Sequence, residues 1–322
     1  MMGVARAFPN IALTKYWGKR DEDLNLPFTS SVSVTLDSLP TIIRVEFHRH
    51  LTRDQLRVNG QRVSVSAEAR VVQFLDHVRT LAGTGLRAQV ASTAEAPMGA
   101  GLASSSAAFA ALALAAVRAL DLSLEPSALS RLARRGSGSA CRSLFAGFVE
   151  WSAGERADGQ DSVAYALHPP EHWPMALLVL VLTAEPKRMS SRDAMRHTVA
   201  TSPFYPAFRE MAASDMLEVR AALAARAWAR LGPVVEAHAL AMHAAALAAR
   251  PAISFWHPDT VRVLEEVQGL RTAGFTAYCT LDAGPNPVVL CPPEEAREVA
   301  RHLRERIHPA ALVPGRPGPG AE

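Results

Sequence analysis

The sequence predicts an α+β protein with two domains. Its 322 residues are enough for two compact domains with separate cores. Strand-like and helix-like segments are mixed in both halves of the chain, and no internal repeat is present. The pair Pro169-Pro170 separates the halves, so we expect one domain at residues 1–170 and a second at residues 171–310.

The first half combines alternating strand patterns with three helical segments. Residues 41–48 place Ile43, Val45 and Phe47 on one face, as a half-buried strand does. Asn59-Gly60 is the strongest hairpin signal in the chain. The expected strands are residues 4–13, 32–36, 41–48, 55–58, 62–66, 86–91 and 145–152, and the expected helices are residues 67–82, 105–120 and 125–135.

The second half opens with an apolar strand and is richer in helix. The expected strands are residues 177–183, 275–282 and 287–291, and the expected helices are residues 191–200, 206–231, 233–249, 259–272 and 293–307. Residues 311–322 are rich in proline and glycine, which predicts a disordered tail.

Composition argues against several classes of protein. The net charge is +3, and no basic run points to nucleic acid. The most apolar run, residues 173–184, is too short to span a bilayer, so we expect no membrane partner. Three cysteines without a CxxC pair, and no signal-peptide core at residues 1–7, favour a cytoplasmic protein with free thiols.

A glycine- and serine-rich stretch at residues 97–106 leads directly into a helix. Glycine lets the backbone approach a ligand closely, and the first turn of a helix offers unpaired N–H groups to a phosphate. The candidate phosphate-binding residues are Gly99, Gly101, Leu102, Ala103, Ser104 and Ser105. The alternative is a small-residue turn in which Ser104 or Ser105 only caps the helix.

Residues 10–20 bring cations and aromatic rings together around one glycine. Lys15 and Lys19 are four residues apart, and Tyr16 follows Lys15. The two lysines can bind phosphoryl groups if the segment bends at Gly18. The alternative is a surface loop whose lysines stay in solvent while Trp17 enters the core.

A second glycine-serine loop at residues 134–143 is rich in arginine. Ser137, Ser139 and Arg142 combine hydroxyls with a guanidinium, as an anion site requires. A flexible linker is the alternative, although linkers rarely contain arginine and cysteine between apolar segments.

Two further side chains are candidates. Asp282 ends an apolar strand before a sharp turn, where it is a catalytic base or a turn-initiating residue. Ser191 stands at a helix start, where it caps the helix or contacts a phosphate. His238 and His243 are five residues apart, the wrong spacing for one helix face, and we assign no protein-bound metal.

Taken together, these segments resemble the mevalonate diphosphate decarboxylase family, within the superfamily of galactokinase, homoserine kinase and mevalonate kinase. The matching segments cover nearly the whole chain in family order. They are NIALTKYWGKRD at 10–21, LPFTSSVSVTL at 26–36, GLASSSA at 101–107, RGSGSACRSLFAGFVEW at 135–151, SSRDAM at 190–195, TVATSPFY at 198–205, MHA at 242–244 and DAGPN at 282–286.

The resemblance implies a superfamily kinase fold with its active site between the domains. The N-terminal domain would be a ribosomal-protein-like α/β unit that binds ATP, and the C-terminal domain a ferredoxin-like α+β unit carrying the catalytic aspartate. ATP and Mg²⁺ are implied, and a homodimer is usual in the family. The implied reaction converts mevalonate 5-diphosphate to isopentenyl diphosphate, CO₂, ADP and phosphate through phosphorylation of the 3-hydroxyl.

The resemblance also assigns roles by motif position. Asp282 takes the place of the catalytic acid/base near the 3-hydroxyl, and Lys15 lies beside it. The 101–107 loop takes the place of the ATP-phosphate loop. The positions that hold the 5-phosphates, or lie next to them, are Tyr16, Lys19, Ser137, Ser139, Arg142 and Ser191.

The chain departs from the family pattern at Thr29, at residues 94–99 and at residues 237–239. Alternatives are therefore a mevalonate 5-phosphate decarboxylase, a mevalonate-type 3-kinase, a kinase for another alcohol, and a non-catalytic phosphate sensor. The presence of both Lys15 and Asp282 favours decarboxylation over a 3-kinase.

Overall fold

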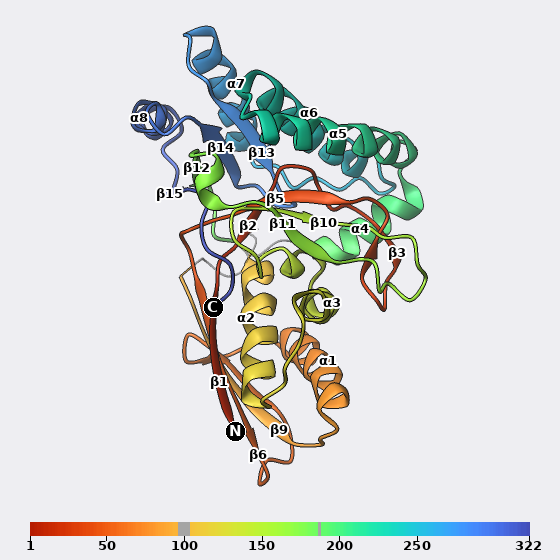
Figure 1. Cartoon of the computed structure of the whole chain (residues 1–322). Coiled ribbons are helices and arrows are strands. Elements are labelled where there is room, and N and C mark those ends of the chain that lie inside the picture. The colour runs from red at the N-terminus through yellow and green to blue at the C-terminus, as the bar shows by residue number, and fades with distance from the viewer. Residues whose placement is uncertain (96–103, 186–187) are drawn as a thin grey trace.

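The computed structural model describes residues 1–95, 104–185 and 188–322. Figure 1 shows an elongated molecule. One end holds β1, β6 and β9 with helices α1–α3, the other end holds α5–α8 with β12–β15, and strands β2, β5, β10 and β11 lie between them.

The first end is a five-stranded sheet covered on one face by helices. Its order is β1 (Met2–Ala7), β6 (Thr41–His48), β9 (Arg87–Ala94), β7 (Gln55–Val58), β8 (Gln61–Arg62). Alternate residues of β1 and β6 are buried, because one face packs against helices. The helices are α1 (Val65–Ala82), α2 (Ser104–Ala119) and α3 (Pro126–Gly136).

The middle sheet connects the two ends of the molecule through a shared core. It has the order β11 (Ala164–His168), β10 (Phe148–Trp151), β5 (Ser31–Thr35), β2 (Asn10–Ala12). Val32 and Phe148 belong to the same buried cluster as Leu177 and Val219 from the second half of the chain. Two short strands, β3 (Lys19–Asp21) and β4 (Leu26–Pro27), pair nearby.

The far end is a four-stranded antiparallel sheet with helices around it. The sheet order is β13 (Tyr278–Leu281), β14 (Pro287–Cys291), β12 (Ala176–Val181), β15 (Ala311–Gly315). The helices are α4 (Ser191–Thr201), α5 (Tyr205–Ala225), α6 (Trp228–Leu247), α7 (Pro258–Thr272) and α8 (Ala296–Ile307). Short 3₁₀ turns occur at Gly138–Cys141 and Pro170–His172.

The prediction of a disordered tail is wrong. Residues 311–315 form β15, which pairs antiparallel with β12. The chain then returns to the first half, where the Gly318 and Glu322 N–H groups donate to the carbonyls of Thr35 and Arg6. Local composition misled the prediction, because the tail pairs with residues that are 130 or more positions away in sequence.

The predicted break between helices at residues 231–233 is also wrong. The break lies at Arg226, which adopts the left-handed conformation with φ 52°, and Pro233 lies inside α6. The local rule that proline ends a helix was overridden by packing of α6 against α5 and β13. Strand β11 was not predicted, whereas the Asn59-Gly60 hairpin and the helix ending before Gly83 are confirmed.

Candidate active site

A cavity of about 690 Å³ lies where the two halves of the chain meet. It collects residues from β2, the segment after β2, the N-termini of α1, α2 and α4, the loop after α3, helix α6 and the end of β13. Its lining residues are Asn10, Ala12, Lys15, Tyr16, Trp17, Lys19, Asn25, Ser66, Ala67, Arg70, Ser105, Ser137, Gly138, Ser139, Arg142, Ser190, Ser191, Arg192, Asp193, Met195, Met242, Asp282 and Ala283.

Lys15 and Asp282, which both line this cavity, form an ion pair. Lys15 Nζ is 2.8 Å from Asp282 Oδ1 and donates a second hydrogen bond of 2.8 Å to the Ala12 carbonyl. The lysine side chain is 2% exposed and that of Asp282 is 29% exposed, so the carboxylate is the member that faces the cavity. Burial lowers the pKa of Lys15, and the charge of Asp282 opposes that effect.

The Arg142 guanidinium is buried and bound by neutral acceptors. Its Nε and Nη2 donate to Asn10 Oδ1 at 3.2 and 3.0 Å, and its Nη1 donates to Ser31 Oγ at 2.6 Å. Nε also donates to Ser33 Oγ at 2.9 Å. Desolvation lowers the pKa of Arg142, so an anion in the cavity would compensate an uncancelled positive charge.

Tyr16 and Lys19 approach the same space from the segment after β2. The Tyr16 ring packs edge-on against Trp151 with centroids 4.7 Å apart, and burial raises the pKa of its hydroxyl. Among the described residues, the buried Tyr16 hydroxyl has no hydrogen-bond partner. A Cβ at Gly138 would lie 2.7 Å from the Tyr16 ring, so this position needs glycine.

Lys19 is nearly buried and pairs with the exposed Glu22, with Nζ 2.9 Å from Oε2. Burial lowers the pKa of Lys19, and the neighbouring cations Arg192 and Arg70 lower it further, against the effect of Glu22. These three cations share one region, and the cavity is lined by more cations than carboxylates, which are Asp193 and Asp282.

The predicted serines also reach the cavity. Ser137 Oγ lies 3.4 Å from Ser105 Oγ and 3.5 Å from Ser139 Oγ, so α2 and the loop after α3 present a row of hydroxyls. Ser191 lines the cavity at the start of α4. The alternative that Ser191 caps this helix is wrong, because the Ser190 hydroxyl accepts the cap hydrogen bond from the Asp193 N–H at 3.1 Å.

Part of the predicted phosphate loop lies outside the described residues. Gly99, Gly101, Leu102 and Ala103 belong to that part, and Ser104 is the first residue of α2. The flexible-linker alternative for residues 134–143 is wrong, since Arg142 and Cys141 are buried and residues 138–141 form a 3₁₀ turn.

Asn10, Arg70 and Arg192 are among the lining residues that were not sequence-predicted candidates. Asn10 fixes the loop after α3, because its Nδ2 donates to Ser143 Oγ at 2.7 Å and to the Ser139 carbonyl at 3.0 Å. Arg70 and Arg192 add positive charge, and burial lowers the pKa of Arg70. Arg192 lies within SSRDAM, so that motif contained a usable signal, whereas Arg70 is one arginine on an ordinary helix.

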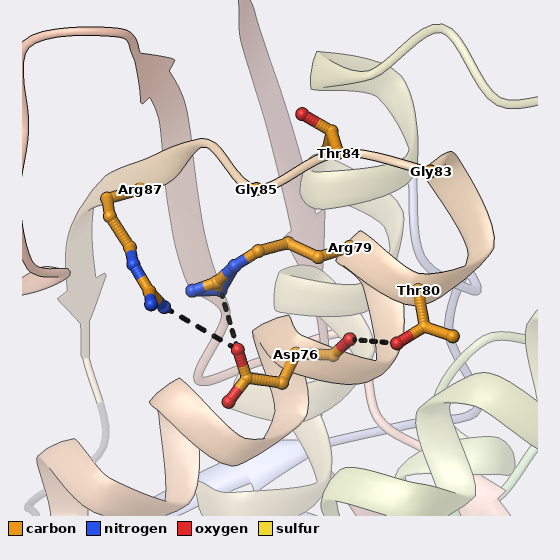
Figure 2. A pocket seen from close by; sticks show the side chains of 7 residues that line it. All are labelled: Asp76, Arg79, Thr80, Gly83, Thr84, Gly85 and Arg87. Carbon is orange, nitrogen blue, oxygen red and sulfur yellow. Dashed lines mark hydrogen bonds and ion pairs between the residues drawn. The ribbon is translucent and has the colours of Figure 1, made fainter.

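A second hollow, of about 370 Å³, lies on the surface beside the C-terminus of α1. Figure 2 shows Arg79 and Arg87 directed toward Asp76 across it. Arg79 also pairs with the buried Asp54, so the two arginines are matched by two carboxylates. This hollow therefore lacks the excess positive charge of the larger cavity.

Within 1–95, 104–185 and 188–322, no group of three or more His, Cys, Asp or Glu side chains is arranged to hold a metal ion. In the same ranges, no helix is long and apolar enough to cross a membrane.

Family models match both halves of the chain. The N-terminal domain model of diphosphomevalonate decarboxylase-like proteins matches residues 7–164, and the mevalonate 5-diphosphate decarboxylase C-terminal domain model matches residues 177–314. The chain belongs to the diphosphomevalonate decarboxylase family. The resemblance stated from the motifs is thereby confirmed.

Curated relatives of this family match over most of their length. The diphosphomevalonate decarboxylase of Bos taurus is 38% identical over 321 residues, covering 93% of this chain and 79% of the relative. The Homo sapiens enzyme is 38% identical over 301 residues, covering 87% of this chain and 74% of the relative.

Solved structures of the family share the whole fold. The mevalonate diphosphate decarboxylase from Enterococcus faecalis superposes with a TM-score of 0.94 at 39% identity, covering 100% of this chain and 98% of the other. A complex of MDDEF with MVAPP, AMPPCP and magnesium gives a TM-score of 0.95 at 40% identity and the same coverage. The predicted α+β kinase-superfamily fold is confirmed by these neighbours.

Proposed function

We propose that the 690 Å³ cavity binds mevalonate 5-diphosphate and ATP together and is where the family reaction occurs. The chain is an ATP-dependent decarboxylase that converts mevalonate 5-diphosphate to isopentenyl diphosphate, CO₂, ADP and phosphate. The observation that carries the site proposal is the Lys15–Asp282 pair, which lines a cavity that also presents several cations and hydroxyls.

Asp282 is the general base in this proposal. A tertiary alcohol is a weak nucleophile at neutral pH, so a base must take its proton as the oxygen attacks the γ-phosphorus of ATP. Asp282 presents a partly exposed carboxylate for that proton, and Lys15 orients it through the 2.8 Å hydrogen bond. The position of Asp282 at the end of β13 holds the base on a rigid element.

The second step breaks two bonds of the phosphorylated substrate. The 3-phosphate leaves with the electrons of its C–O bond, and the carboxylate leaves as CO₂ while its C–C electrons form the new double bond. Several anionic groups must be held close together during these steps. The buried cation Arg142 and the mutually repelling Lys19 and Arg192 supply the balancing charge.

Hydroxyl and cationic side chains on one side of the cavity are assigned to the 5-diphosphate. They are Tyr16, Lys19, Ser137, Ser139, Arg142 and Ser191. The unpartnered hydroxyl of Tyr16 supports this assignment, because a buried donor is costly unless a ligand accepts its proton.

ATP and Mg²⁺ fit the residues at the N-terminus of α2. The Ser105 hydroxyl lines the cavity there, and a helix N-terminus favours phosphate. Mg²⁺ neutralises charge on the ATP phosphates when bound, and the Ser105 oxygen is of the type it prefers. We assign Gly99, Gly101, Leu102, Ala103 and Ser104 to the same phosphate site from the family motif.

The test offers mevalonate 5-diphosphate and mevalonate 5-phosphate, each with Mg-ATP, and measures ADP and CO₂ separately. We expect equal amounts of ADP and CO₂ from the diphosphate. Asp282→Asn should lower kcat by about 10²–10⁴-fold, the usual contribution of a general base. Turnover of Asp282→Asn at the wild-type rate would remove Asp282 from the mechanism.

Asp121→Asn is the matched control for Asp282→Asn. Asp121 is exposed at the end of α2 with φ 53°, a conformation that asparagine also adopts readily. Its substitution should leave kcat unchanged.

Three further assignments extend this proposal. The chain divides into an ATP-binding domain at residues 1–170 and a domain at 171–310 that carries Asp282. It works as a cytoplasmic homodimer without nucleic-acid partners. Sedimentation equilibrium of the full chain tests the homodimer, and fractionation of cells that express it tests the cytoplasmic location.

A further inference from the structure

The segment of residues 15–19 has almost no regular structure of its own, yet it supplies Lys15, Tyr16 and Lys19 to the cavity. Lys15 is anchored at one end of the segment by Ala12 and Asp282. The backbone between Tyr16 and Lys19 needs a separate support, because irregular backbone without partners would not hold side chains in fixed positions.

Tyr205 gives that support from the second half of the chain. Its hydroxyl donates a 3.0 Å hydrogen bond to the Trp17 carbonyl across 188 positions of sequence. Tyr205 is 4% exposed and is the first residue of α5, so its ring is held by the packed helix. Phe28 packs edge-on against the same ring, with centroids 6.0 Å apart.

Gly18 allows the close approach of this ring to the segment. Its φ is 102°, and a Cβ built there would lie 1.9 Å from the Tyr205 hydroxyl oxygen and 2.9 Å from Val199 Cγ2. The backbone at Gly18 is therefore pressed against the junction of α4 and α5. Two adjacent residues of the segment therefore contact Tyr205. Trp17 accepts its hydrogen bond, and Gly18 lies close to its hydroxyl.

The junction also connects two groups of cavity residues. Helix α4 ends at Thr201, four residues before Tyr205, and its first turn carries Ser191 and Arg192 into the cavity. Tyr205 thus links the helix pair that presents Ser191 and Arg192 to the segment that presents Tyr16 and Lys19. The Lys15–Asp282 pair has its own anchors and does not depend on this link.

We propose that Tyr205 is a positioning residue for the diphosphate end of the substrate, acting through the Trp17 carbonyl and Gly18 on Tyr16 and Lys19. The proposal rests on the function proposed above. Tyr205 does not line the cavity and does not touch the substrate. It determines how well the anion-binding side chains are aligned, and it leaves the proton-transferring pair unchanged.

The experiment replaces Tyr205 by phenylalanine, which keeps the ring and removes the hydroxyl. One neutral hydrogen bond contributes about 0.5–1.5 kcal/mol, so KM for mevalonate 5-diphosphate should rise about 2- to 12-fold. Without ATP, the calorimetric Kd for mevalonate 5-diphosphate should rise by the same factor. We expect kcat and the KM for ATP to stay within about twofold of wild type, because Lys15, Asp282 and the N-terminus of α2 are unaffected.

Tyr165→Phe is the matched control, since Tyr165 is 39% exposed on β11. It should leave KM, Kd and kcat unchanged. Melting temperatures of wild type, Tyr205→Phe and Tyr165→Phe are measured to check that each protein is folded.

Two outcomes would overturn the proposal. Tyr205→Phe with wild-type KM and Kd for the diphosphate shows that the hydroxyl does not align the segment, whatever its melting temperature. A fall in kcat without a change in the KM for either substrate places the effect at the reacting pair instead. Wild-type protein that neither binds nor turns over mevalonate 5-diphosphate refutes the proposed function itself, and with it the role of Tyr205.

Discussion

His243 should contribute to the dependence of this protein's stability on pH between about 5 and 7, and His243→Asn should remove that contribution. His243 lies on α6 and is 1% exposed. Its ring packs between Phe255 and Trp256, with centroid distances of 6.0 and 5.6 Å. Burial, and then the nearby positive charge of Lys15, lower its pKa from 6.5 to about 4.

The sign and size follow from proton linkage. The unfolded chain binds a proton at this imidazole at higher pH than the folded protein does, so acidification favours unfolding. The stabilisation is present above pH 6.5 and is lost as the pH falls toward 4. Between pH 7 and pH 5 the loss is about 2 kcal/mol. For a chain of 322 residues this corresponds to a fall of about 3 °C in Tm.

The assay is the Tm of wild type and His243→Asn at pH 7 and at pH 5, with His50→Asn as the control. His50 is an exposed histidine two residues after the end of β6, so its replacement should leave the acid-induced fall unchanged. The absolute Tm of His243→Asn also reports lost packing, so only the difference between the two pH values is compared. Equal falls in wild type and His243→Asn would refute the reasoning.

Three other predictions concern the cavity. Lys15→Met removes a charged hydrogen bond to Asp282 and should lower kcat about 10- to 150-fold in the coupled ADP assay, with little change in KM. In Arg142→Lys the shorter ammonium group cannot bond all the acceptors around the guanidinium, and each acceptor left unpaired costs about 1–3 kcal/mol. Tm and kcat/KM should therefore both fall. Unchanged values would show that a point charge suffices. Gly18→Ala forces a Cβ against the Tyr205 hydroxyl and should destabilise the protein by about 1–3 kcal/mol in denaturant titration, whereas a wild-type midpoint would contradict the close approach.

Motif order in the sequence anticipated which segments form the cavity. Lys15, Arg142 and Asp282 were assigned from three segments far apart in the chain, and the structure brings all three to one cavity. Arg70 was missed, because a single arginine on an amphipathic helix has the same local pattern whether it faces solvent or a cavity. Tyr205 was missed as a support for a related reason: its hydrogen-bond partner is a backbone carbonyl, which has no sequence signal.

The two errors in the predicted fold have one physical origin. The tail at residues 311–322 was predicted disordered from its prolines and glycines, and a helix break was expected between residues 231 and 233, beside Pro233. Both rules describe local conformational preference. In the folded protein, strand pairing with β12 and packing of α6 against β13 contribute more free energy than those preferences.

The sequence by itself determined the family, the α+β class and the chemistry, because ordered motif segments over nearly the whole chain resemble one family, and that resemblance implies its reaction. Tertiary structure alone decided how those groups work together. It buried Lys15 against Asp282 across 267 positions, enclosed Arg142 among neutral acceptors, and placed Tyr205 behind the segment of residues 15–19. Burial and distance set pKa and alignment, and both depend on which distant segments become neighbours when the chain folds.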